Sequence, residues 1–326
     1  MGSSNQTITT ISEFIVNGFS GLQDEQSQII IFVLLLVIYI IVLLGNLSIL
    51  ILIKLDEALH TPMYMLISVL ACVDICIPSV TVPKMLTNFV FHTKAILFGS
   101  CLTQMVFYIG IGTMESFLLM VMAYDRYVAI CNPLHYPTIM TTNHIVKLCF
   151  LCWIGGMMTP MVPLYLALRL PFCGPNIVLH SFCDYSAVVR LACADVTLNA
   201  IVSLTIAMSV LLIPLAFIVF SYFKIIRSVL KVASSEGRRK AFSTCAAHLF
   251  VITIFYLVAV FVFISYRISG FSADTRIMAA VLQNLIPPMV NPVIYCLKTK
   301  DIQKSFFRLL HRRKATSGLC SYSLMI

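Results

Sequence analysis

The sequence is poor in charge, since only 11% of its 326 residues are Asp, Glu, Lys or Arg and 60% are hydrophobic. Average soluble domains carry about 25% charged residues. With a mean hydropathy of +0.98, the chain has too few polar side chains to cover a water-soluble fold of this length. We therefore expect a protein that lies in a lipid bilayer.

The sequence also lacks sustained internal repeats, low-complexity tracts and linkers between soluble domains. This absence predicts a single domain over residues 1–326. It also argues against a small-molecule transporter, because transporter folds are commonly built from repeats. The first 28 residues contain no Lys or Arg and no apolar core before a cleavage site, so no removable signal peptide is expected.

Long apolar runs are abundant. A membrane-spanning helix needs about 20 mostly apolar residues, and seven stretches of the chain meet this length. They cover residues 29–53, 63–83, 101–130, 145–168, 197–223, 241–265 and 276–297. The expected fold is all-α, a bundle of seven transmembrane helices.

The segment after the last span has the pattern of a short amphipathic helix. Such a helix lies along a membrane surface, with its apolar face in the lipid and its basic face toward the headgroups. The two faces consist of Ile302, Phe306, Leu309 and Leu310 on one side and Lys304, Arg308 and Arg312 on the other. We expect an eighth helix here, on the cytoplasmic surface.

The distribution of Lys and Arg predicts the orientation, because cytoplasmic loops carry an excess of both. If residues 1–28 are extracellular and the tail at 298–326 is cytoplasmic, 16 of the 22 basic residues fall on the inner side. The net charge of +9 then belongs to short loops that face membrane lipids. It does not imply a nucleic-acid partner.

Four of the 12 cysteines are expected on the outer side, namely Cys101, Cys173, Cys183 and Cys193. Disulfides form in oxidising compartments, so we expect two bridges. Four cysteines allow three pairings, and the sequence does not choose among them. Asn5 opens an Asn-Gln-Thr sequon on the same side and is a candidate glycosylation site.

Polar side chains inside the spans are costly and are candidates for function. Asn46, Asp74, Glu115 and Asn291 lie in the first, second, third and seventh spans. Asp74 and Glu115 would repel each other if both were ionised, so they either share a proton or hold a cation such as sodium between them. A satisfied packing network fits the spacing equally well.

Seven short motifs follow one another along the chain: GN at 45–46, LHTPMYM at 59–65, PKM at 83–85, MAYDRYVAIC at 122–131, SY at 221–222, KAFSTCAAHL at 240–249 and PPMVNPVIY at 287–295. Together they resemble the odorant receptors of the rhodopsin-like G-protein-coupled superfamily. The resemblance covers nearly the whole chain. CLTQM at 101–105, Glu115 and the loop SFCDYSAVVRLACAD at 181–195 resemble the class I, fish-type branch.

The resemblance implies a two-state switch at the inner end of the bundle. In the resting state Asp125 holds Arg126. An outward movement of the sixth helix then frees Arg126 and opens a cleft for the Gα subunit of an olfactory stimulatory G protein. Activation of this G protein raises cyclic AMP. An anchor at the membrane interface is the alternative role for this charged pair. The implied switch residues are Asp125, Arg126, Tyr127, Tyr222, Lys240, Asn291, Pro292 and Tyr295, with Tyr222 and Tyr295 as alternative partners of Arg126.

The resemblance also implies an odorant pocket in the outer half of the bundle, at Tyr108, Ile109, Gly112, Thr113, Ser186, Ser203, Ile206, Tyr256, Val260, Phe263 and Arg267. Arg267 matches a position that holds a ligand carboxylate in class I relatives; its alternative role is an outer-leaflet anchor. The implied disulfides are Cys101–Cys183 and Cys173–Cys193. The implied location is the plasma membrane of olfactory sensory neuron cilia.

Other functions fit the sequence less well. A retinal pigment needs a lysine for a Schiff base in the last span, and residues 276–297 contain none. Cys245 and His248 are one helical turn apart, but no third ligand or orienting acid accompanies them, so neither a zinc site nor an enzyme is expected. A non-olfactory chemosensory receptor of the same fold remains the main alternative. Apart from a sodium ion or shared proton at Asp74 and Glu115, no cofactor is expected.

Overall fold

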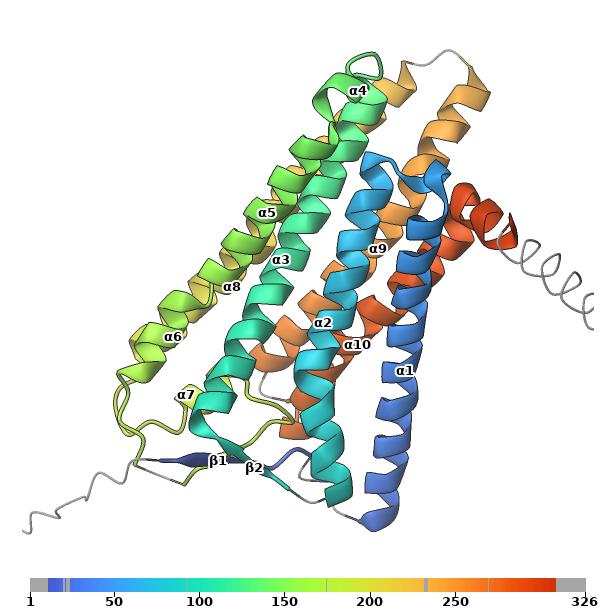
Figure 1. Cartoon of the computed structure of the whole chain (residues 1–326). Coiled ribbons are helices and arrows are strands. Elements are labelled where there is room, and N and C mark those ends of the chain that lie inside the picture. Colours follow the sequence, from blue (N-terminus) through green and yellow to red (C-terminus); the bar gives the residue numbers. More distant parts are fainter. Residues whose placement is uncertain are drawn as a thin grey trace, which may run out of the picture.

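Within the residues that it describes, the computed structural model has seven helices long and apolar enough to cross a membrane. The structure describes residues 11–19, 21, 24–91, 93–173, 175–231, 234–268 and 270–308. The crossing helices are α1 (Glu25–Leu55), α2 (Pro62–Phe91), α3 (Phe98–Cys131), α5 with α6 (Thr142–Met158 and Met161–Leu168), α8 (Thr197–Leu230), α9 (Ser235–Arg267) and α10 (Ala273–Lys298), arranged as one bundle in Figure 1. The prediction of a seven-helix bundle is confirmed.

Local signals explain several helix ends. Asp24 precedes α1, and its side chain accepts a 2.8 Å hydrogen bond from the backbone N–H of Ser27, which satisfies one of the free N–H groups of the first turn. Ser272 caps α10 in the same way through Thr275. Pro62 opens α2, at the first helical position that proline favours. Pro160 separates α5 from α6, since it has no N–H to continue the hydrogen-bond ladder.

The short elements lie at the two ends of the bundle. We call the end that carries β1 (Glu13–Val16), β2 (Ala95–Leu97), β3 (Ile177–Val178) and α7 (Tyr185–Val189) the sheet end. The opposite end carries η1 (Glu57–Leu59) and α4 (Tyr136–Ile139). We call it the Arg126 end, because α3 brings Arg126 there.

A three-stranded sheet covers the sheet end and was not predicted. β1 pairs antiparallel with β2 and parallel with β3, so three segments far apart in the sequence meet. Phe14 on β1 is fully buried, with its ring centroid 5.5 Å from that of Phe98 and 5.8 Å from that of Phe172. Strands this short contain too little alternation to be recognised from the sequence alone.

Helix α3 lies inside the bundle and packs closely against α5 through two glycines. A Cβ atom added to Gly156 would lie only 2.6 Å from the backbone oxygen of Gly110. No side chain larger than hydrogen fits between these two backbones. Helix α9 packs mainly against α10.

Two disulfides lie at the sheet end, one between a helix and a loop and one within the loop region. Cys101 of α3 pairs with Cys183, and Cys173 pairs with Cys193, with Cα atoms 5.4 and 5.9 Å apart. These are the pairs that the resemblance implies. Asn5 lies outside the described residues.

Residues 300–308 form a helix after α10, where the amphipathic helix is expected. Ile302 is buried and Phe306 is exposed. Arg308 donates to both carboxylate oxygens of Asp56, the residue that caps η1, each at 3.0 Å. Leu309, Leu310 and Arg312 lie outside the described residues.

Candidate functional site

The charged pair at the Arg126 end is buried. Asp125 is 1% exposed and Arg126 is 6% exposed. Arg126 donates from Nε to Asp125 Oδ2 at 2.8 Å and from Nη2 to the same oxygen. The other oxygen, Oδ1, accepts a 2.8 Å hydrogen bond from the hydroxyl of Tyr136 in α4. A buried pair with both carboxylate oxygens engaged is compensated inside the protein, which argues against a role as an interface anchor.

The two tyrosines expected as alternative partners of Arg126 are engaged differently. The hydroxyl of Tyr222 on α8 lies 2.8 Å from Nδ1 of His248 on α9 and forms a buried hydrogen bond with it. The hydroxyl of Tyr295 on α10 is buried and has no hydrogen-bond partner in the part of the chain that the structure describes. His248 was considered above only as a metal or catalytic group. Here its ring links α8 to α9, a role that no sequence pattern indicated.

Tyr127 and Lys240, two further switch residues, lie on α3 and α9. Tyr127 is half-buried and packs against the core of the bundle. The side chain of Lys240 lies outside the described part of the structure.

A polar core connects α1, α2 and α10. Asn291 donates from Nδ2 to both oxygens of Asp74, at 3.1 and 3.0 Å. Asn46 donates to the carbonyl oxygen of Pro288 at 2.9 Å, which becomes available because Pro292 has no N–H to donate back to it. Gly45 allows the close approach, since an added Cβ would lie 3.0 Å from Pro292 Cγ.

Glu115 is less well satisfied than Asp74. Both carboxyl groups are buried, but among the described residues Oε1 of Glu115 has no hydrogen-bond partner, and neither has Oδ1 of Asn291. Buried oxygen atoms without donors suit a proton or a hard cation, which oxygen ligands bind. A fully satisfied packing network therefore describes Asp74 but not Glu115.

The expected ligand residues all lie in the half of the bundle nearest the sheet end, on α3, α7, α8 and α9. Tyr108 packs edge-on against Phe182, with ring centroids 5.0 Å apart, and Thr113 donates to the carbonyl oxygen of Ile109. Tyr256 donates to the carbonyl oxygen of Leu211 at 3.2 Å. Gly112 has open space around its Cα.

The remaining ligand residues are more dispersed. Ser186 and Ser203 bond within their own segments, to Asp184 and to the carbonyl oxygen of Ala200. Ile206 lines a groove of about 350 Å³ between α5–α6 and α8. Val260 and Phe263 are 51% and 39% exposed on α9. Arg267 ends α9, and its side chain lies outside the described part of the structure.

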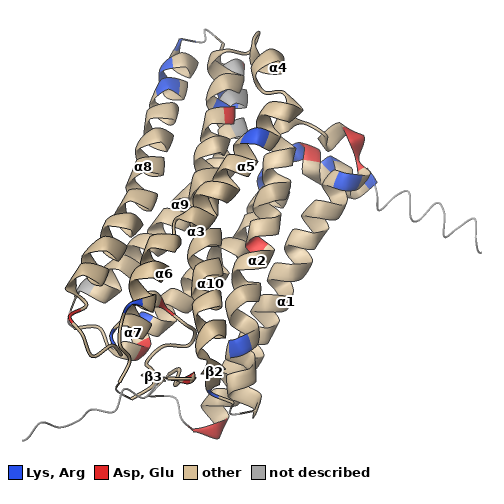
Figure 2. Cartoon of the chain, turned by 60° about the vertical axis from the view of Figure 1, so that its left-hand side comes forward, with Lys and Arg blue, Asp and Glu red and all other residues tan. Residues whose placement is uncertain are grey.

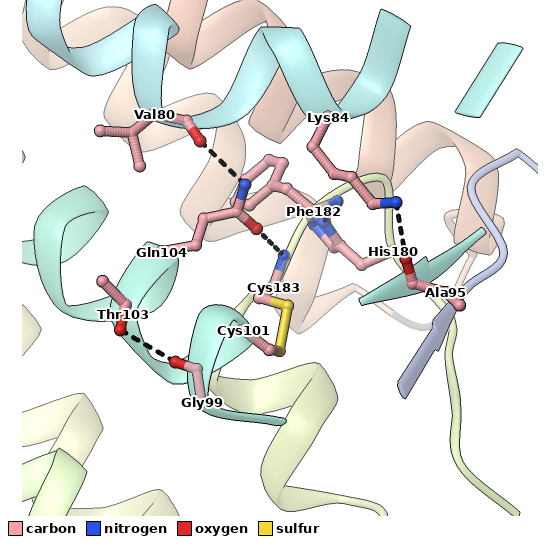
Figure 3. The surroundings of a disulfide bond; sticks show 10 residues. All are labelled: Val80, Lys84, Ala95, Gly99, Cys101, Thr103, Gln104, His180, Phe182 and Cys183. Atoms are coloured by element: carbon pink, nitrogen blue, oxygen red, sulfur yellow. Dashed lines mark hydrogen bonds between the residues drawn. A yellow bond between two sulfur atoms is a disulfide. The ribbon is translucent and has the colours of Figure 1, made fainter. Parts of the chain in front are cut away.

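Sequence reasoning missed several side chains that hold the loop at the sheet end. Gln104 on α3 donates to the carbonyl oxygen of Val80 at 2.8 Å and accepts from the backbone N–H of Cys183 at 2.9 Å, beside the Cys101–Cys183 disulfide (Figure 3). Lys84 donates to the carbonyl oxygen of Ala95 at 2.7 Å. The sequence shows only that Gln104 is a polar residue near the start of a span, and it does not indicate the contacts with Val80 and Cys183.

His180 in the same loop is buried, and its Nε2 lies 3.2 Å from the hydroxyl of Tyr266 on α9. Its ring also packs edge-on against Phe182, at 4.4 Å between centroids. Burial lowers the pKa of His180, although nearby Asp184 opposes this shift. The loop thus contacts α9 through a neutral imidazole.

Comparisons with known proteins agree with this architecture. The family model described as "Olfactory receptor" matches residues 35–313. The chain belongs to the olfactory receptor family. Human Olfactory receptor 6N1 is 43% identical over 302 residues, which cover 93% of this chain and 96% of that protein. Mouse Olfactory receptor 1E16 is 42% identical over 311 residues, covering 95% and 98%.

Squid rhodopsin has the same fold, with a TM-score of 0.71 and 15% identity over 90% of this chain and 89% of that one. The olfactory receptor is therefore a membrane protein with the fold of a G-protein-coupled receptor, and not an enzyme. None of these matches tests the class I branch, which stays a prediction.

Proposed function

We propose that this olfactory receptor binds a small, mainly apolar odorant in the sheet-end half of its bundle and activates a stimulatory G protein, raising cyclic AMP. The observation that carries the proposal is the buried Asp125–Arg126 pair with Tyr136 on its second carboxylate oxygen. The buried pair holds the receptor in a closed state. A partner that binds more tightly to the state in which the pair is broken shifts the receptor toward that open state. Tyr222 and Tyr295, expected to receive the freed Arg126, lie on other helices.

The same proposal places the sheet end outside the cell and the Arg126 end in the cytoplasm. The ribbon segments coloured blue for Lys and Arg lie mainly at the Arg126 end in Figure 2, which agrees with the positive-inside tendency. Two disulfides at the sheet end suit an oxidising exterior. The plasma membrane of olfactory cilia is the location that family membership supports.

For the ligand we propose a carboxylate-bearing molecule with an apolar body. Ile206, Val260 and Phe263 supply apolar contacts, and Arg267 at the end of α9 supplies the counter-charge. A guanidinium holds a carboxylate in two parallel hydrogen bonds, which gives direction as well as energy. At Asp74 and Glu115 we propose one shared proton or sodium ion, and a ligand affinity unchanged by replacing sodium with a large organic cation would exclude the ion.

The test is a cyclic-AMP screen of short carboxylic acids, alcohols, aldehydes and amines in cells with and without the stimulatory Gα subunit. We expect acids to be the agonists and the response to vanish without Gα. A desolvated charge-assisted contact contributes about 1.5 to 3 kcal/mol, so Arg267→Ala should weaken an acid agonist about ten- to a hundredfold, and Arg267→Lys should restore it only in part.

Arg190→Ala, which removes another basic residue at the sheet end, serves as the matched control. Agonists that are only neutral or cationic would overturn the ligand class and leave the receptor function in place. Ligand-driven flux that persists without Gα would instead indicate a transporter.

A further inference from the structure

Phe182 is a loop residue whose side chain lies inside the helix bundle. It belongs to the segment between β3 and α7, and loops normally run over the surface of a protein. Its side chain is nevertheless 0% exposed. It shares one apolar cluster with buried side chains of α2 and α10, namely Val82, Met85, Ile277, Ala280, Val281 and Leu285. The loop therefore supplies part of the core between two helices.

The chain is fixed on both sides of Phe182. Cys183 is tied to α3 by its disulfide and by its backbone N–H, which donates to Gln104 at 2.9 Å (Figure 3). On the other side, Nε2 of His180 lies 3.2 Å from the hydroxyl of Tyr266 on α9. The backbone N–H of Phe182 itself donates to Nδ1 of His180 at 3.4 Å. These contacts hold the Phe182 ring between attachments to α3 and α9.

The ring also contacts one of the expected ligand residues. Tyr108 packs edge-on against Phe182, with ring centroids 5.0 Å apart, and Tyr108 borders the same apolar cluster. The other expected ligand residues come from α3, α7, α8 and α9, and none comes from α2 or α10. Phe182 thus lies at the border between the expected odorant site and the apolar side chains of α2 and α10.

The surroundings of the ring suit only an apolar occupant. The buried members of the cluster are aliphatic, methionine and phenylalanine side chains. When a large buried side chain is truncated, the structure around it relaxes only in part. An apolar cavity of about 150 Å³ stays dry and binds benzene. Truncation of Phe182 removes a benzene ring from such a lining, so the space left behind matches a phenyl group.

We propose that the Phe182 ring fills an apolar site between α2, α3 and α10 and thereby limits the size of the odorant that fits beside Tyr108. Without the ring, this site accepts a phenyl-sized apolar group. Phe182 is then a residue that determines odorant specificity from within the loop. The limit on odorant size rests on the proposed function, whereas the apolar site itself does not.

The apolar site is tested on the purified full-length receptor with benzene as the probe. Benzene should raise the melting temperature of Phe182→Ala, because a ligand that binds only the folded state stabilises it. The rise should exceed that of the wild type and of Phe91→Ala, which removes an exposed ring at the end of α2. A rise in Phe182→Ala no larger than in these two proteins overturns the proposal.

The size limit is tested by cyclic AMP with pairs of carboxylic acids, alcohols and aldehydes. Each pair consists of a straight-chain compound and the same compound with a terminal phenyl group. In Phe182→Ala, the potency of the phenyl compound relative to its straight-chain partner should rise about tenfold over the wild type, because burial of a whole ring is favourable. This ratio is taken within one variant, so differences in expression cancel.

Phe172→Ala is the matched control for the size limit. Phe172 is also a buried aromatic residue at the sheet end, but it belongs to a different cluster, with Phe14 and Val178. Its truncation should leave the potency ratio at the wild-type value. An unchanged ratio in Phe182→Ala, or an equal change in Phe172→Ala, overturns the size limit.

Two further outcomes are also decisive. If Phe182→Ala does not fold, Phe182→Leu takes its place, and both the melting temperature with benzene and the potency ratio should shift in the same direction by a smaller amount. The absence of both shifts in Phe182→Leu overturns the proposal. If no compound activates the wild-type receptor, the proposed function fails, and the benzene test still decides the apolar site.

Discussion

The hydroxyl of Tyr136 donates a 2.8 Å hydrogen bond to Oδ1 of Asp125, whose other oxygen binds Arg126. Tyr136 lies on α4, in the loop that follows α3, so a loop residue holds the carboxylate in the orientation that pairs with Arg126. The closed position thus depends on three side chains rather than two.

Tyr136→Phe should therefore raise basal signalling. A hydrogen bond to a charged group contributes about 1.5 to 3 kcal/mol. Because Tyr136 is half-buried, water can replace part of the lost hydrogen bond, so we expect basal signalling to rise about three- to tenfold. Basal cyclic AMP per surface receptor is the measurement. Tyr165→Phe, at an exposed tyrosine of α6, is the control. A lowered basal level would mean that Tyr136 supports the open state.

Arg126→Ala should abolish ligand-driven signalling while the receptor still reaches the surface and binds ligand. The reason is that the guanidinium is expected to engage the tyrosines and the G protein once it leaves Asp125. Surface labelling, ligand binding and cyclic AMP are measured together. Lys147→Ala, at an exposed basic residue of α5, is the control, and an Arg126→Ala receptor that signals at wild-type strength would refute the switch.

The disulfides should appear as Cys101–Cys183 and Cys173–Cys193 when peptides are mapped without reduction. Loss of one bridge is expected to cost about 2 to 5 kcal/mol, which thermal unfolding of the purified receptor can detect for Cys173→Ser with Cys193→Ser. Cys149→Ser, at a cysteine without a disulfide, is the control. Free thiols at the four sheet-end positions would contradict the assignment.

Gly156→Ala should destabilise the receptor, because its new methyl group would meet the backbone oxygen of Gly110 at 2.6 Å. Forcing the two helices apart is expected to cost about 1 to 3 kcal/mol. Gly112→Ala is the matched control, since its methyl group enters open space. The melting temperature of each purified variant is the measurement, and equal effects of the two substitutions would disprove the close packing of α3 and α5.

Acidification should destabilise the sheet end through His180. Burial lowers its pKa in the folded state, whereas the unfolded chain keeps a pKa of about 6.5. Below about pH 6.5 the unfolded chain therefore binds more protons, and stability falls until the folded pKa is also passed. His180→Gln should show a smaller fall in melting temperature between pH 7.5 and 5.5, whereas His135→Gln, at an exposed histidine, should behave as wild type. A larger fall in melting temperature for His180→Gln than for the wild type would contradict the prediction, because it would mean that His180 stabilises the receptor at low pH.

The sequence by itself determined the seven spans, the all-α class and the family. These follow from local properties: a bilayer requires about 20 apolar residues per crossing, and a helix satisfies its backbone within its own segment. The order of short motifs around Arg126 and Asn291 identified the family without any contact being known. The implied disulfide pairs came from the same resemblance, since cysteine spacing left three pairings open.

Only the tertiary structure decided which polar groups meet. His248 was recognisable as a histidine near Cys245, but its partner Tyr222 lies 26 residues away, and Gln104 reaches Cys183 across 79 residues. The sheet joins three short strands that carry no period of their own. Such partners depend on how helices pack and rotate against one another, and residue spacing within one segment contains no information about that packing.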